Sequence, residues 1–367
     1  MAINRIELKD FLVFKGGFAA DFCHGVNVLI GGNATGKTTL LKVLYWGCEF
    51  SNKSVLESNG NLQLNQSKDS PYTTKFLLHD YFNLERTEEQ LKMDYVSDIK
   101  LYSDKIDNTY PALDVSVSKG LGSIQMHHIG NVFPLQSKAL AQWCNLKVRS
   151  VFIPVTEMLS HSRGLLALNR ERPVPFDCTE IDIISKAELE PMRVVTKNAQ
   201  CVIDDVSKVI GGKVVFDGKD FFVERENDSS RIPFSLEANG FRKFGLLWKL
   251  LRNGLLESGS ILFWDEPENS LNPELITVLV DILLNLAQNG VQIFIATHDY
   301  NLARYFDVRK DKSVPVMFHN LSKANDGQIV CQSSPEYIKL PNNLLEKASE
   351  DLFNAVIADA LEVQNDE

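Results

Sequence analysis

A glycine-rich stretch near the N-terminus has the residue types and spacing of a phosphate-binding loop. Gly31 is followed by four variable positions and then by Gly36, Lys37 and Thr38, which is the pattern G-x-x-x-x-G-K-[ST]. The apolar run before it (26–30) predicts a buried strand, and residues 38–46 predict a helix. Backbone N–H groups in such a turn, together with the helix N-terminus, can bind polyphosphate. We expect Lys37 to reach the β- and γ-phosphates and the Thr38 hydroxyl to bind Mg²⁺. The predicted nucleotide-binding residues of this loop are Gly31, Gly32, Asn33, Ala34, Thr35, Gly36, Lys37, Thr38 and Thr39.

Two carboxylates follow a second apolar run. Residues 261–264 predict a central strand, and Asp265 and Glu266 come directly after it. Open α/β sheets bind ligands at the carboxyl ends of their strands, so Asp265 is expected beside the glycine-rich loop. A carboxylate there can hold Mg²⁺ through water, and its neighbour can orient and deprotonate an attacking water. The sequence therefore predicts Asp265 as a metal ligand and Glu266 as the catalytic base.

A histidine ends the next apolar run. Residues 291–296 predict another strand, which leads into Thr297 and His298. Taken alone, such a histidine is more often a surface loop residue. Its place one strand after the carboxylate pair favours a functional role, in which His298 hydrogen-bonds the γ-phosphate or the attacking water.

A second helix start is suited to binding an anion. Small residues, Ala238, Asn239 and Gly240, open a predicted amphipathic helix that continues through Leu256. If this helix caps a separate lobe, it cannot reach the loop of its own chain. It could instead complete the loop of a second copy.

Composition narrows the class of protein. The 367 residues carry a net charge of −10, so the overall field would repel nucleic acid, and DNA or RNA binding would need a local basic patch. The six cysteines are scattered without a C-x-x-C pair, which argues against a zinc site and against a disulfide framework. No apolar run approaches the roughly 20 residues that a membrane span needs. We therefore expect a soluble cytoplasmic protein.

These motifs together resemble the ABC-type ATPase heads, and most closely the SMC-like and OLD-family ATPases. In the order of that family, Gly31–Thr38 corresponds to Walker A, Ala238–Gly240 to the signature, Ile261–Asp265 to Walker B and His298 to the switch histidine. Ser270–Pro273 falls where the family has its D-loop. The resemblance implies ATP held between two heads, each P-loop facing the partner's signature helix. ATP binding would then close a homodimer, and hydrolysis would open it.

The sequence departs from the family pattern at several positions. Ala238 stands where the signature usually has serine, so one γ-phosphate contact is missing and we expect turnover that is slow or dependent on a partner. No glutamine stands at the expected Q-loop, and Glu157 is the nearest candidate for that metal-binding position. The segment after His298 is too short for the Toprim nuclease domain of OLD-family proteins, so we expect no such domain.

The predicted fold class is an α/β P-loop NTPase with an ABC-ATPase-like head, a mixed β-sheet, an antiparallel β subdomain and a helical lobe. Residues 1–50 and 145–310 are expected to form the ATPase core, with the helical signature lobe at about 155–256. Residues 51–144 are expected to form a β-rich insertion, and 311–367 a C-terminal extension of strands and a helix. The smaller predicted elements are antiparallel strands within 3–22, strands at 75–79, 98–102 and 113–117, helices at 136–145 and 160–172, a helical region at 180–210 interrupted near Pro191, a hairpin at 213–224 and a terminal helix at 344–361.

The function predicted first is an ATPase that switches or powers a partner effector. By resemblance, such proteins often belong to bacterial phage-defence or toxin–antitoxin modules. The alternatives are an SMC-like DNA-repair or chromosome-associated ATPase and, less favoured, the nucleotide-binding subunit of a transporter. The absence of sustained heptads and the acidic charge count against the second, and the missing LSGGQ-type signature counts against the third. A module that holds ATP without hydrolysing it is a further alternative, but Glu266 argues against it.

Overall fold

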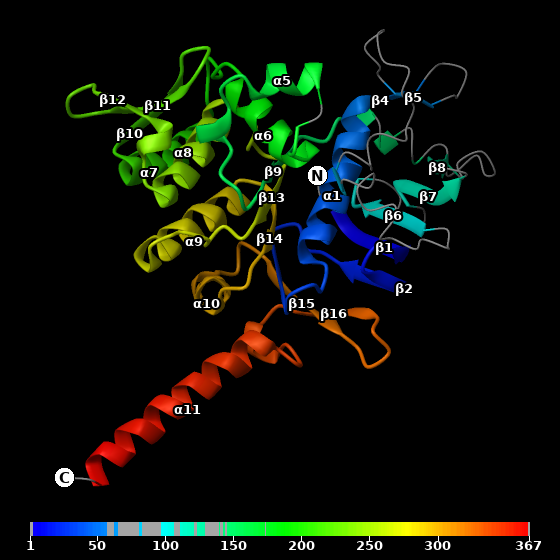
Figure 1. Cartoon of the computed structure of the whole chain (residues 1–367), viewed down its shortest axis with the longest axis vertical. Helices are drawn as coiled ribbons and strands as arrows, with labels where there is room; N and C mark the ends of the chain where they lie inside the picture. Colours follow the sequence, from blue (N-terminus) through cyan, green and yellow to red (C-terminus); the bar gives the residue numbers. More distant parts are fainter. Residues whose placement is uncertain are drawn as a thin grey trace.

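A six-stranded, mostly parallel sheet forms the centre of the computed structural model (Figure 1). Its strand order is β16-β15-β3-β14-β13-β9, and β16 alone in this sheet runs antiparallel to its neighbour. The strands are β3 (Val26–Gly31), β9 (Ser150–Ile153), β13 (Ile261–Asp265), β14 (Gln292–Ala296), β15 (Val316–Lys323) and β16 (Ile329–Ser334). The structure describes residues 3–56, 62–64, 81–82, 97–105, 111–120, 123–128, 139, 142–143, 145–172 and 174–365.

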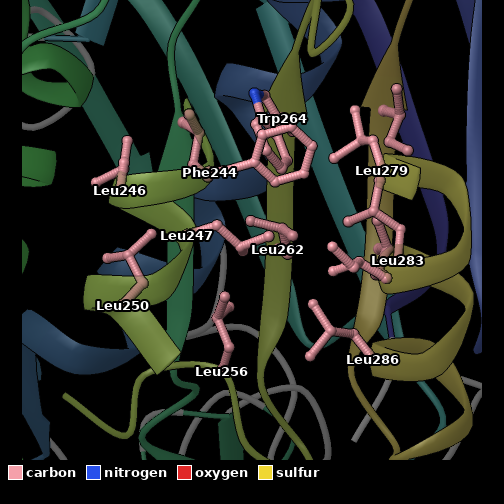
Figure 2. Close-up of a cluster of buried hydrophobic side chains, with 14 of the residues drawn as sticks. Phe244, Leu246, Leu247, Leu250, Leu256, Leu262, Trp264, Leu279, Leu283 and Leu286 are labelled. Atoms are coloured by element: carbon pink, nitrogen blue, oxygen red, sulfur yellow. The ribbon is translucent and has the colours of Figure 1, made fainter. Parts of the chain in front are cut away.

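The central strands are buried on both faces, which explains their continuous apolar sequences. In β13, Leu262 and Trp264 point to one side of the sheet, and Ile261 and Phe263 point to the other. Figure 2 shows Leu262 and Trp264 packed between leucines of α8 (Asn239–Arg252) and α9 (Pro273–Gln288). The apolar run at 261–264 therefore places Asp265 at the edge of a fully covered sheet.

The opposite side of the sheet is covered by helix α1 (Lys37–Lys53), which directly follows the glycine-rich loop. A second, antiparallel sheet of order β2-β1-β6-β7-β8 packs over α1. Its strands are β1 (Ile3–Phe11), β2 (Phe14–Asp21), β6 (Ser97–Ser103), β7 (Leu113–Gly120) and β8 (Ser123–His128). Helix α1 thus lies between two sheets, which holds the loop before it in a fixed direction.

Most of the smaller predicted elements in this half are present. The predicted strands at 98–102 and 113–117 are β6 and β7, and Phe11 and Phe14 are fully buried core residues. The predicted strand at 75–79 lies outside the described residues, as does most of the predicted helix at 136–145. A short antiparallel pair, β4 (Ser54–Leu56) and β5 (Leu62–Leu64), follows α1.

The helical lobe consists of α5 (Leu165–Glu171), α6 (Cys178–Glu188), α7 (Lys197–Ile210) and α8, with a small sheet beside them. The helix predicted at 160–172 is broken into the 3₁₀ helix η2 (Leu159–His161) and α5, because Gly164 adopts a left-handed φ of 70°. The region 180–210 forms two helices separated around Pro191. The predicted hairpin is β10 (Gly212–Phe216) and β11 (Phe221–Arg225), which β12 (Arg231–Pro233) and the 3₁₀ helix η3 (Phe234–Leu236) follow.

A partly buried lysine joins the helical lobe to the P-loop helix. Lys186 of α6 donates hydrogen bonds to the Tyr45 hydroxyl (2.5 Å), the Glu49 carboxylate (3.2 Å) and the Ser150 carbonyl oxygen (2.8 Å). Tyr45 and Glu49 lie one turn apart on α1, so a single ammonium connects α6, α1 and β9. Lys42 of α1 also forms an ion pair with Asp177, the N-cap of α6. The orientation of the lobe is therefore tied to α1.

The C-terminal part adds strands to the central sheet and ends in a long helix. Strand β15 pairs directly with the P-loop strand β3, and α10 (Tyr300–Arg309) and the 3₁₀ helix η4 (Tyr337–Lys339) lie nearby. Helix α11 (Leu344–Asn365) extends away from the body in Figure 1, and residues 351–359 are all exposed. The division of the chain into a core, an insertion at 51–144 and an extension at 311–367 stays a prediction. In the described ranges, no helix is both long and apolar enough to cross a membrane.

Candidate functional site

The glycine-rich loop closes on itself between β3 and α1. The Lys37 ammonium donates to the carbonyl oxygens of Gly31 (2.9 Å) and Gly32 (3.0 Å), and the Thr35 hydroxyl donates to Gly32 (2.9 Å). Gly36 has a φ of +89°, and a Cβ there would lie 2.7 Å from Phe14 and Val13 of the β1–β2 turn. Glycine is required at Gly36 both by its backbone angle and by the turn that covers it. The loop is therefore held by bonds to its own carbonyl oxygens and is covered by the β1–β2 turn.

The Lys37 ammonium is buried, and this changes its acidity. Its pKa is lowered to about 8, chiefly because burial disfavours the charged form, while Asp265, Glu266 and Glu268 act in the opposite direction. A phosphate between this ammonium and the backbone N–H groups would supply a close anionic partner. The loop is therefore suited to binding an anion such as a phosphate group.

The loop and the carboxylate strand meet at one hydrogen bond. The Thr38 hydroxyl donates to the Asp265 carboxylate over 2.8 Å. Asp265 is the last residue of β13 and is 3% exposed, and burial raises its pKa to about 6 although the Thr38 bond lowers it. A hydroxyl and a buried carboxylate side by side fit the oxygen ligands that Mg²⁺ prefers.

A metal ion at this point would need further ligands from a nucleotide. Within the described part of the chain, no group of three or more His, Cys, Asp or Glu side chains could hold a metal ion. Mg²⁺ commonly takes one or two protein oxygens together with substrate phosphates and water. Thr38 and Asp265 therefore fit a magnesium ion that arrives with a nucleoside polyphosphate.

The two predicted catalytic residues are brought together. The Glu266 carboxylate lies 3.8 Å from the His298 Nε2, and the two come from the ends of neighbouring parallel strands β13 and β14. Glu266 has a left-handed φ of 46°, and its backbone N–H donates to the Ala296 carbonyl oxygen (2.9 Å). Burial lowers the pKa of His298, and the Lys37 charge acts in the same direction. A largely neutral imidazole beside a carboxylate can hydrogen-bond a water or a phosphate oxygen.

Two further residues of this region were not predicted from the sequence. Lys243 of α8 donates to the carbonyl oxygens of Glu266 (2.9 Å) and Pro267 (3.2 Å). Glu268 accepts from the Thr297 hydroxyl (2.7 Å) and from the His298 backbone N–H (3.2 Å). In the sequence, Lys243 is simply one residue of an amphipathic helix. Glu268 belongs to no recognisable motif. The one signal was the clustering of three carboxylates within 265–268.

The signature-like residues stand at the start of α8. Helix α8 begins at Asn239, with Ala238 as an N-cap that has no side-chain capping bond. A Cβ on Gly240 would lie 3.2 Å from Leu271, so the helix start packs on the D-loop-like segment. Figure 1 places α8 and α1 on different sides of β13. The roles assigned to Asn239 and Gly240 stay predictions that require a second copy.

Glu157 makes its described contacts with η2 and α8. Its carboxylate accepts from the Leu159 backbone N–H (2.5 Å) and the Ser160 hydroxyl (2.5 Å), and lies 3.5 Å from the Arg242 guanidinium. These bonds cap η2 and connect it to α8. Its predicted role as a metal ligand stays a prediction, and no described contact joins Glu157 to Thr38 or Asp265.

Comparison with known proteins gives matches to nucleotide-binding proteins. Residues 169–304 match the family described as "AAA domain, putative AbiEii toxin, Type IV TA system". The DNA replication and repair protein RecF of Oenococcus oeni is 30% identical over 145 residues, which is 36% of this chain and 37% of RecF. The L-cystine import ATP-binding protein TcyN of Bacillus subtilis is 27% identical over 97 residues, 24% of this chain and 38% of TcyN. The chain thus spans less than two-fifths of these relatives.

Solved structures give a distant similarity. The SMC head domain from Thermotoga maritima aligns with a TM-score of 0.47 and 13% identity, over 91% of this chain and 99% of that one. An SmcHead bound to the C-winged helix domain of ScpA aligns with a TM-score of 0.47 and 12% identity, over 91% of this chain and 98% of that one.

The fold and the site define a class of protein. The structure has three parts that are typical of an ABC-type head. They are a P-loop between β3 and α1, an aspartate at the end of β13 in the same sheet, and a lobe that carries α8. This chain has the fold and the motifs of an ABC-type P-loop ATPase head, and the partial matches to the AbiEii-type AAA family and to RecF agree with that class.

Proposed function

We propose that this chain binds ATP with Mg²⁺ and hydrolyses it between two copies in a head-to-tail dimer. The observation that carries the proposal is the 2.8 Å hydrogen bond between Thr38 and Asp265, which joins the P-loop to the carboxylate strand. Glu266 and His298 lie at the adjoining strand ends, with 3.8 Å between carboxylate and imidazole. Binding, metal and water-activating groups thus converge on one edge of one sheet.

Each residue has a role in the proposed reaction. Lys37 and the loop N–H groups hold the β- and γ-phosphates, and Thr38 and Asp265 hold Mg²⁺, which neutralises phosphate charge. Glu266 accepts a proton from the attacking water as that water forms a bond to the γ-phosphorus and the bond to the β–γ bridging oxygen breaks. His298 orients the γ-phosphate or the water through its imidazole.

In the proposed dimer, the second copy supplies its signature-like residues to the P-loop of the first. The family resemblance implies that Asn239 and Gly240, at the start of α8, face the P-loop of a partner rather than the loop of their own chain. Ala238 brings no hydroxyl to the γ-phosphate, so basal turnover is expected to be slow. ATP binding would close the dimer and hydrolysis would release it.

The proposed role is to switch or power a partner effector. The matched family is described as an AbiEii-type component of a type IV toxin–antitoxin system, which supports a place in a toxin–antitoxin or phage-defence module. The match to RecF supports the alternative of a DNA-associated ATPase. The net charge of −10 favours the first over the second. Stimulation of turnover by duplex or single-stranded DNA would favour the second.

The proposal is tested by the mass of the Glu266→Gln protein in solution, measured with and without Mg²⁺-ATP. We expect ATP to convert monomer into dimer, because binding is intact and hydrolysis is blocked. Lys37→Ala is the matched control and should neither bind ATP nor dimerise. Normal turnover by Glu266→Gln would remove its assignment as the catalytic base, and a mass that does not respond to ATP would contradict the sandwich dimer.

A further inference from the structure

A buried lysine of α8 donates hydrogen bonds to the backbone of the segment that carries the proposed catalytic base, Glu266. Lys243 is 6% exposed, and its ammonium donates to the carbonyl oxygens of Glu266 (2.9 Å) and Pro267 (3.2 Å). These two carbonyls belong to the two successive peptide groups that follow the Cα of the proposed catalytic base. Since Glu266 has a φ of 46°, which a non-glycine residue adopts at a cost, its backbone needs such external bonds to keep this conformation.

A partly buried glutamate makes a similar contact with the end of the next strand, β14. Glu268 accepts hydrogen bonds through Oε1 from the Thr297 hydroxyl (2.7 Å) and the His298 backbone N–H (3.2 Å). Its other oxygen, Oε2, is shielded from solvent and has no hydrogen-bond partner in the described part of the chain. A carboxylate so placed fixes the backbone from which the His298 imidazole projects.

The two contacts form a continuous connection. It runs from α8 through Lys243 to the Glu266–Pro267 backbone, and then through Glu268 to Thr297 and His298. The same helix begins at Asn239, four residues before Lys243, with the signature-like residues. A shift of α8 along its axis would therefore act on Glu266 and His298 without any contact between α8 and the nucleotide of the same chain.

We propose that Lys243 and Glu268 are positioning residues that set Glu266 and His298 for hydrolysis and transmit the position of α8 to them. This inference rests on the proposed ATPase function. Neither residue touches the nucleotide in this scheme, so their loss should lower kcat while the affinity for ATP is largely kept.

The first test compares two lysines of the same helix. Lys243→Met removes the ammonium with little change of volume, and Lys249→Met is the matched control. Lys249 is also buried (3% exposed), but its ammonium reaches the Leu189 carbonyl oxygen (3.4 Å) away from the site. We expect Lys243→Met to lower kcat by about tenfold or more, because small displacements of catalytic groups are costly, with ATP affinity kept within about threefold. Lys249→Met should keep the wild-type kcat.

The second test separates the two possible roles of Glu268. Glu268→Gln keeps an oxygen that accepts hydrogen bonds from Thr297 and His298. Glu268→Leu keeps a side chain of similar size but has no acceptor. We expect Glu268→Gln to retain most of kcat and Glu268→Leu to lose it. In amide NMR spectra, the His298 N–H resonance should move in Glu268→Leu and stay near its wild-type position in Glu268→Gln.

These readouts distinguish failure of this inference from failure of the proposed function. A wild-type protein that does not hydrolyse ATP would contradict the proposed function, while the NMR comparison would still decide whether Glu268 holds His298. Equal kcat values for wild type and Lys243→Met, or an unchanged His298 amide in Glu268→Leu, would overturn the positioning roles.

Discussion

The Thr38 hydroxyl donates a hydrogen bond to the Asp265 carboxylate across 227 positions of sequence, over 2.8 Å. Asp265 is nearly inaccessible to solvent, and burial raises its pKa to about 6 from an ordinary value of 3.8. The stability of the nucleotide-free fold therefore falls as pH rises from about 3.8 to about 6, and the full cost of the charged carboxylate is present above that range. A cation brought by the nucleotide would offset this cost, so ligand binding and stability are coupled at this residue.

Asp265→Asn is expected to raise the thermal midpoint of the nucleotide-free protein at pH 7. The amide has no charge to desolvate, and the shift in pKa from 3.8 to about 6 corresponds to about 3 kcal/mol at most. The gain should shrink as pH falls from about 6 toward 3.8, because the wild-type carboxyl then becomes neutral in the folded state. Thermal melts over this pH range check the sign. The same variant should lose the stabilisation that Mg²⁺-ATP gives to wild type, and a variant less stable than wild type at pH 7 would contradict the argument.

Two adjacent loop glycines should differ sharply in their tolerance of alanine. Gly31 has a φ of +142°, and a Cβ there would lie 2.1 Å from the Leu321 carbonyl oxygen of β15. Gly31→Ala must move β15 or the loop, and we expect a loss of about 3 kcal/mol or more. Gly32→Ala is the control, because its nearest neighbour would be Leu344 at an ordinary 3.5 Å. Denaturant melts without nucleotide compare the two, and equal stabilities would show that the close approach is relieved at no cost.

His298 should act as a neutral imidazole at pH 7. Burial and the Lys37 charge lower its pKa, while Glu266 raises it less. In the pH profile of kcat/KM, which reports the nucleotide-free protein, activity should fall on the acid side with a midpoint below 6.5, as the imidazole gains a proton. His298→Gln should lower kcat by about tenfold to a hundredfold and remove this limb of the profile. A limb that persists unchanged in His298→Gln would have to come from another group.

Lys186→Met should loosen the helical lobe from α1. The substitution removes the ammonium that three acceptors share, among them the Glu49 carboxylate, which is buried. Breaking a buried ion pair from one side costs about 3–5 kcal/mol. The measurement is the thermal midpoint of Lys186→Met, of Glu49→Gln and of the double variant. The coupling is supported if the double variant loses less than the sum of the single losses, and additive losses would mean that the two groups act independently.

Much of the site could be predicted because it depends on local patterns. The strand–loop–helix at 26–46 and the apolar strands before Asp265 and His298 are short-range signals, and parallel strands bring their carboxyl ends to one edge. The fold class followed from the same motifs, and the helical break near Pro191 followed from proline chemistry.

The remainder depends on tertiary contacts that no spacing encodes. Lys243 reads as one residue of an amphipathic helix, and its contact with the Glu266 carbonyl spans 23 positions. The family resemblance suggests Glu157 for the Q-loop position, and the sequence does not indicate its contacts with η2 and Arg242. The helix predicted at 160–172 is interrupted because Gly164 turns the chain into a left-handed conformation, which the apolar periodicity alone does not reveal.

Helix α11 is attached to the molecule at the nucleotide loop. Asn320, paired with Ile30 of β3, donates to the carbonyl oxygens of Pro341 (2.8 Å) and Asn342 (3.1 Å) just before the helix, and Leu344 lies beside Gly32. Beyond that point Leu352, Phe353, Val356 and Ile357 are exposed on a rod of 22 residues, about 33 Å long. A partner that bound the exposed end of this helix and moved it would therefore apply a force to the P-loop through Leu344, which lies beside Gly32. Asn320 would hold the start of the helix in place during that movement.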